Sequence, residues 1–259
     1  MDTGKTVALR KSWRHRIGFA LALCGLALPA GALQLTLASG RDNTLYSLSG
    51  TLSNGQGEHF FAGQTGPRGG EQTLRALVEF DIAAALPAGA IVDDVSLVLS
   101  PTTPRARTGG TLALHRATRA WGEGSSAGSM GEGGGGAASL GDATWTDAIL
   151  GTDLWTTPGG DFDATPLATA AATGAPVVLS SALLVADVQQ ALDDPTLHFG
   201  WLLKLTDETL LAFRFGSFQS TSGNAPVLTI DYTLVPEPAS AVLVALGLLA
   251  LAARRTSRG

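Results

Sequence analysis

The sequence predicts an all-β fold, a jelly-roll-like β-sandwich, flanked by an apolar segment at each end of the chain. Short apolar runs recur along the body with turn residues between them, which is typical of sandwiches. The 259 residues include 33 Gly, and only 15% are charged, so many turns and few solvated helices are expected. We expect one domain over residues 33–234, with an N-terminal signal helix before it and a C-terminal transmembrane helix after it.

Alternation of apolar and polar residues predicts the strands of this domain. Residues 33–37 form the first strand, and residues 74–82 form the clearest one. In the strand at 91–99, Val95 and Leu97 are expected to face the core. The remaining strands are expected at 60–62, 111–118, 177–179, 199–205, 210–218 and 226–234.

Turns, one helix and one long loop connect these strands. Asn54-Gly55 is the sharpest hairpin signal, and residues 86–90 predict a further turn. Residues 183–192 have near-helical apolar spacing, which predicts a single short helix. Residues 122–141 are so rich in Gly, Ser and Ala that they have little apolar surface to bury, and this predicts a flexible loop.

The first 32 residues have the three parts of a signal peptide. An apolar stretch over 17–28 leads to Ala30 and Ala32, a small-residue cleavage site. The basic residues before that stretch are Lys5, Arg10, Lys11, Arg14 and Arg16. We therefore expect export through the Sec translocon and cleavage by signal peptidase; the alternative is an uncleaved anchor helix. Cys24, the only cysteine, would leave with the signal, so the mature domain would have no disulfide.

The last 25 residues form a second membrane-directed segment. A short polar motif precedes fifteen uncharged residues, 239–253, and a basic end follows them. A span of about 20 apolar residues is usual, so this helix is short for a permanent one, and the arginines would hold it at the cytoplasmic side. The candidate sorting and processing residues are Val235, Pro236, Glu237, Pro238, Arg254 and Arg255.

This arrangement resembles the PEP-CTERM sorting signal of Gram-negative bacteria. The resemblance implies recognition and cleavage by exosortase, a membrane transpeptidase, near Pro236-Glu237-Pro238. The chain would then pass through an inner-membrane intermediate and end at the cell surface or in the extracellular matrix. Each proline biases the residue before it toward extended structure, so the motif stays out of the helix that follows. The alternative is a simple C-terminal anchor.

The body resembles the DNRLRE family of exported β-sandwich domains, which are related to carbohydrate-binding modules. The matching segments are Arg41-Asp42-Asn43-Thr44-Leu45, Leu77-Val78-Glu79-Phe80-Asp81-Ile82, Leu86-Pro87-Ala88-Gly89-Ala90-Ile91, Trp121-Gly122-Glu123-Gly124, Ala143-Thr144-Trp145, Trp155, Gly159-Gly160-Asp161-Phe162, Asp187-Val188, Phe199-Gly200-Trp201-Leu202-Leu203 and Phe213-Arg214-Phe215. Tyr46 and Ser47 depart from the pattern, because Arg and Glu would stand there, and Phe218-Gln219 replaces a frequent Ser-Arg-Glu.

The charge and the aromatic residues limit the functions that the sequence allows. Five basic residues precede Ala32 and three arginines follow Ala253, which leaves a strongly acidic body that would repel nucleic acid. The candidate carbohydrate contacts are Trp121, Trp145 and Trp155, which lie near turn-rich sequence. The alternative is that these three indoles plug the edge of the sandwich, while Trp201 belongs to the core.

No catalytic motif stands out. The sequence has no Gly-x-Ser-x-Gly and no His-Glu-x-x-His, and His115 is expected to point outward from its strand. Candidates for a structural calcium site are Asp142, Asp161 and Asp163, with solvated acids as the alternative. We expect a non-enzymatic surface or matrix protein that associates with exopolysaccharide and needs no cofactor. A purely structural matrix protein and a polysaccharide-degrading enzyme are the alternatives, since paired carboxylates converge only in space.

Overall fold

A computed structural model describes residues 31–38, 40–102, 109–235, 244–250, 252 and 254. It divides into two units, a body over residues 30–236 and the two termini, and each is described by itself. The predicted signal helix, including Ala30, lies outside the described residues. Residues 244–250 are helical, and no helix of the described residues is long and apolar enough to cross a membrane.

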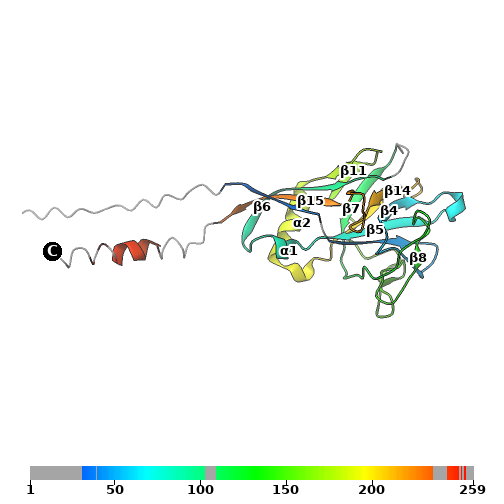
Figure 1. Cartoon of the computed structure of the whole chain (residues 1–259), viewed down its shortest axis with the longest axis horizontal. Coiled ribbons are helices and arrows are strands. Elements are labelled where there is room, and N and C mark those ends of the chain that lie inside the picture. The colour runs from blue at the N-terminus through cyan, green and yellow to red at the C-terminus, as the bar shows by residue number, and fades with distance from the viewer. Residues whose placement is uncertain are drawn as a thin grey trace, which may run out of the picture. The chain divides into compact units, whose positions relative to one another are not determined.

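The body consists mostly of antiparallel sheets, one of them curled into a half-barrel, with few helices (Figure 1). The four-stranded sheet has the order β1-β15-β6-β12. Its strands are β1 (Leu33–Leu37), β15 (Val227–Leu234), β6 (Ala90–Leu99) and β12 (Val177–Leu179).

The larger sheet has seven strands in the order β11-β7-β13-β5-β4-β14, and β2 also pairs with β5. Its strands are β11 (Ala168–Ala171), β7 (Thr111–Arg116), β13 (Trp201–Leu205), β5 (Thr73–Glu79), β4 (His59–Gln64), β14 (Phe213–Gly216) and β2 (Arg41–Tyr46). Two ribbons of two strands complete the β-structure. They are β3 (Leu52–Ser53) with β8 (Gly136–Ala137), and β9 (Asp147–Ile149) with β10 (Asp153–Leu154).

The helices of the body are short. They are η1 (Pro67–Gly69), α1 (Ile82–Ala85), α2 (Ala182–Asp193) and η2 (Pro195–Leu197). α2 confirms the helix expected at 183–192, and it begins at Ser181, whose side chain accepts a hydrogen bond from the Leu184 N–H at 3.0 Å. α1 and α2 lie together at one end of the body, and β8 lies at the other end (Figure 1).

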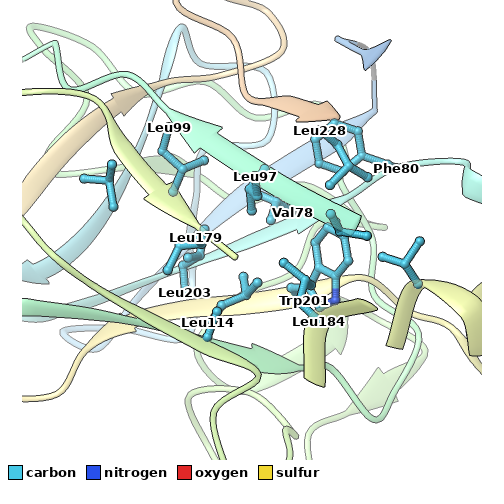
Figure 2. Close-up of a cluster of buried hydrophobic side chains, with 14 of the residues drawn as sticks. Val78, Phe80, Leu97, Leu99, Leu114, Leu179, Leu184, Trp201, Leu203 and Leu228 are labelled. Carbon is cyan, nitrogen blue, oxygen red and sulfur yellow. The ribbon is translucent and has the colours of Figure 1, made fainter. Parts of the chain in front are cut away.

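The two large sheets and α2 share one hydrophobic core. Figure 2 shows Leu97 and Leu228 of the four-stranded sheet facing Val78 and Leu203 of the seven-stranded sheet, with Leu184 of α2 at the side. The inward orientation expected for Val95 and Leu97 is confirmed, because both are fully buried. Trp201 lies in this core as expected.

The seven-stranded sheet is buried on its outer face as well. Leu45, Leu77 and Leu202 point away from the main core and form a second cluster with residues of the segment 121–162. β5 therefore contributes Val78 to one core and Leu77 to the other. This second layer determines where the candidate functional residues lie.

Candidate functional site

Two of the three candidate tryptophans belong to this second cluster. Trp121 is 1% exposed and Trp155 is 5% exposed. Their indole N–H groups donate to the carbonyl oxygens of Phe199 and Thr144, each at 2.8 Å. Both side chains are therefore buried. A buried indole face cannot stack on a sugar ring, so both plug the outer face of the sheet, as in the alternative interpretation.

Trp145 is the one of the three that stays partly exposed. The guanidinium carbon of Arg75 lies 5.0 Å from the centre of its ring. Gly159 lies beneath both side chains with φ of 97°, and a Cβ there would come within 2.6 Å of the Arg75 guanidinium and 2.8 Å of the indole. Only glycine fits this close approach, which fixes Arg75 and Trp145 against the segment that follows Trp155.

A surface hollow of about 600 Å³ lies beside this pair. Its lining residues are Arg75, Thr118, Arg119, Thr156, Thr157, Pro158, Gly160, Asp161, Phe162 and Ala164. The lining therefore combines three hydroxyl groups, two guanidinium groups, one carboxylate and one aromatic ring.

Arg75 is held on one side of the hollow by fixed partners. Its guanidinium donates to both carboxylate oxygens of Glu208, at 2.7 and 3.0 Å, and to the Gly159 carbonyl oxygen at 2.8 Å. Lys204 forms a second ion pair with Glu208 at 2.9 Å. Burial alone would raise the pKa of Glu208, but the bonds from Arg75 and Lys204 outweigh it and lower that pKa. Phe162 lies against Arg75 and Lys204, at 5.5 and 5.7 Å from its ring centre.

Arg119 and Asp161 form the other side. The Arg119 guanidinium donates to Asp161 at 2.9 Å and to Asp153 at 2.8 Å. Burial acts to raise the pKa of Asp161, yet the backbone N–H groups of Thr156 and Thr157, together with Arg119, lower it. Each charge in the lining thus has a partner of opposite sign. Such a compensated, hydroxyl-rich surface suits a polar ligand with many hydroxyl groups better than a bare ion.

The three acids considered for calcium are separated and otherwise engaged. Asp142 is fully buried and accepts hydrogen bonds from the N–H groups of Ser125 and Ser139, both at 2.7 Å, and from the Ser126 hydroxyl. Asp161 is paired with Arg119. Asp163 is exposed. Within the described ranges, no three His, Cys, Asp or Glu side chains converge in a way that could hold a metal ion.

His115 points away from the main core, as expected. It is nevertheless only 6% exposed, because Phe162 and Asp163 cover it. Its Nδ1 lies 2.8 Å from the Asp163 carbonyl oxygen, which requires the proton on Nδ1. The covering segment, which includes Gly159 to Phe162, thus buries the outer face of β7.

The sorting residues lie mostly outside the part of the chain that the structure describes. Val235 and Arg254 are exposed, and so is Ala32 at the predicted signal cleavage site. Pro236, Glu237, Pro238 and Arg255 fall in undescribed ranges. Their predicted role stays a prediction.

The sequence did not single out Arg75, Arg119, Thr156 and Thr157 as functional residues. Their signal was indirect, since they surround the Gly159-Gly160-Asp161-Phe162 segment. Comparison with known proteins adds no further guide to this site, because no family model and no curated protein matches the chain.

Proposed function

We propose that the body is a non-enzymatic exported domain that associates with exopolysaccharide through the hollow between Arg75 and Arg119. The observation that carries the proposal is the lining of hydroxyls, paired charges and one aromatic ring, which offers both donors and acceptors to sugar hydroxyls. Trp145, partly exposed beside the hollow, supplies further aromatic surface.

We make the same kind of proposal for the fold of the body. Two antiparallel sheets that share one core support a jelly-roll-like β-sandwich of the DNRLRE type. In this proposal the signal peptide directs the chain to the Sec translocon, and exosortase then cuts it near Pro236-Glu237-Pro238. The acidic domain would end at the surface or in the extracellular matrix of a Gram-negative bacterium.

Electrophoresis in gels that contain neutral or acidic polysaccharides tests the binding. Ala164 lines the hollow and is exposed, so Ala164→Arg fills the hollow without disturbing a core. We expect this variant to bind polysaccharide about tenfold more weakly, which corresponds to about 1.4 kcal/mol of binding free energy. Ala175→Arg, at an exposed loop position outside the lining, is the matched control. If no polysaccharide retards the folded protein, the domain is a purely structural matrix component.

A further inference from the structure

Three segments that are distant in sequence meet at one carboxylate. Asp42 lies on β2, Glu123 lies at the start of the glycine-rich segment 122–141, and Gln219 lies between β14 and β15. The Asp42 backbone N–H at 3.4 Å and the Gln219 side-chain amide at 2.8 Å both donate to the same oxygen, Oε1 of Glu123. Glu123 and Gln219 are half-buried, so this cluster adjoins solvent.

Two oxygens of the cluster are buried without a partner in the described residues. The Asp42 side chain is fully buried; its Oδ2 accepts from the Phe218 N–H at 2.7 Å, but its Oδ1 has no donor. Oε1 of Gln219, one residue beyond Phe218, is also buried and unpaired. Unpaired buried acceptors are rare and costly, so each one calls for an explanation.

The charge around these oxygens is negative. Glu123 and Glu132 are acidic neighbours of Asp42. Arg41, the residue before Asp42, and His59 have other partners. The guanidinium of Arg41 donates to Glu79 at 2.7 Å and to the Trp121 carbonyl oxygen, and His59 contacts Glu132. Oδ1 of Asp42 and Oε1 of Gln219 therefore lie among acidic residues and have no donor in the described residues.

We infer that Asp42, Glu123 and Gln219 bind a hard divalent cation, with calcium the best fit. Carboxylate and side-chain amide oxygens are ligands that calcium prefers, and calcium tolerates irregular geometry with water completing the shell. Magnesium demands a near-ideal octahedron, which three groups from three separate segments do not offer. The bound ion would fasten β2, the glycine-rich segment and the β14–β15 loop to one another.

This site is separate from the hollow proposed for polysaccharide and differs from the acids that the sequence suggested. With three protein ligands, its dissociation constant is expected on the order of 10⁻⁴ to 10⁻³ M, the range of extracellular calcium modules. That range would keep the site filled outside the cell and empty in a calcium-poor cytoplasm.

Thermal unfolding of the full-length chain in detergent, in EDTA and with added CaCl₂, tests the site. At about tenfold excess over the dissociation constant, calcium should raise the melting temperature by about 3–6 °C. Asp42→Asn keeps an oxygen acceptor for the Phe218 N–H and removes the carboxylate charge. This variant should fold in EDTA and show no calcium response.

Asp93→Asn is the matched control, because Asp93 is exposed on β6 and the chemical change is the same. It should keep the full response, and titration calorimetry with CaCl₂ should give a heat for this control that Asp42→Asn lacks. An equal calcium response in Asp42→Asn would overturn the inference. So would a wild type whose melting temperature is the same in EDTA and in CaCl₂.

Discussion

At the scale of single residues, a few buried polar side chains join distant parts of the chain. Asn43 is fully buried on β2. Its Oδ1 accepts from the N–H groups of Thr44 at 2.7 Å and Asn54 at 2.9 Å and from the Ser53 hydroxyl at 3.0 Å. Its Nδ2 donates to the Glu123 carbonyl oxygen at 3.0 Å. One side chain thus holds β2, the turn at 54 and the glycine-rich segment.

Asn43→Ala should lower the free energy of unfolding by about 3 kcal/mol. The change leaves several buried donors and acceptors without partners, and each one costs about 1–3 kcal/mol. Urea denaturation measures the effect. Asn224→Ala is the control, since the Asn224 side chain makes no hydrogen bond to the described residues and its loss should cost well under half as much. Equal costs would mean that Asn43 has no special role.

Asp187 of α2 is a second such residue, buried against the core. It accepts from the Trp201 indole N–H at 2.7 Å and pairs with Arg116. Asp187→Ala removes the partner of a charge and of an indole, so we expect a loss of about 3–5 kcal/mol, near the lower end because Arg116 retains some exposure. The measurement is a denaturation midpoint with unchanged m-value. Asp193→Ala, at an exposed position of the same helix, should cost less than about 1 kcal/mol.

Sequence patterns predict the burial of some of these residues but not their hydrogen-bond partners. The apolar pattern of residues 199–205 predicted that Trp201 is buried, and the structure confirms it. No pattern could pair Trp201 with Asp187 or Asn43 with Glu123, because those contacts join segments far apart in sequence. The same limit applies to the hollow, where Arg75 and Arg119 come from different strands and loops.

At the scale of elements, the glycine-rich segment has a defined path where the sequence predicts a flexible loop. Asp142 holds Ser125 and Ser139, and β8 pairs with β3. The Glu132 carboxylate accepts from the N–H groups of Glu58 at 3.1 Å and His59 at 2.9 Å. The composition correctly predicted that this segment buries little apolar surface. It could not show that the carboxylates of Asp142 and Glu132 would hold the backbone in place instead.

Asp142→Ala should release this segment. Two backbone N–H groups and one hydroxyl lose their shared acceptor, so limited proteolysis should cut within 125–141 much faster than in the wild type, while the rest of the body stays resistant. The cut sites are read by mass spectrometry. Asp163→Ala serves as control because its carboxylate is exposed. An unchanged cleavage rate in Asp142→Ala would show that Asp142 does not hold the segment.

The strands were predictable where one face is polar and one is buried. β6 and β15 alternate in this way and were expected at nearly their observed bounds. β2 was not expected, since Asp42, Asn43 and Thr44 are consecutive buried polar residues whose partners lie elsewhere in the chain. The second layer over β5 could not be predicted from the sequence pattern either, because burial of Leu77 depends on a segment that follows it by more than forty residues.

At the scale of the whole molecule, burial of histidines links stability to pH. Burial lowers the pKa of His115 and of His198, so the unfolded chain binds their protons more tightly than the folded chain. Their contribution is fully present above the ordinary histidine pKa of about 6.5 and is lost as pH falls toward the folded-state value.

The measurement that tests this link is the unfolding free energy of the wild type and of His115→Gln between pH 7 and pH 5. The wild type should lose stability relative to the variant by at most about 1.4 kcal/mol per pH unit. The raised pKa of Asp42 acts in the opposite direction but is common to both proteins, so it cancels in the difference. Parallel pH profiles would contradict a neutral, buried His115.

The proposed sorting signal of the whole chain can be tested independently of the fold. β15 ends at Leu234, one residue before Val235, so cleavage near Pro236-Glu237-Pro238 would leave every strand of the body intact. Replacing these three residues with Ala should block processing, because the extended, proline-fixed recognition segment is lost. The unprocessed chain should then stay in the inner-membrane fraction and keep the mass of its apolar tail. Asp231→Ala, five residues before Pro236, should be processed normally; equal processing of both variants would refute exosortase recognition at this motif.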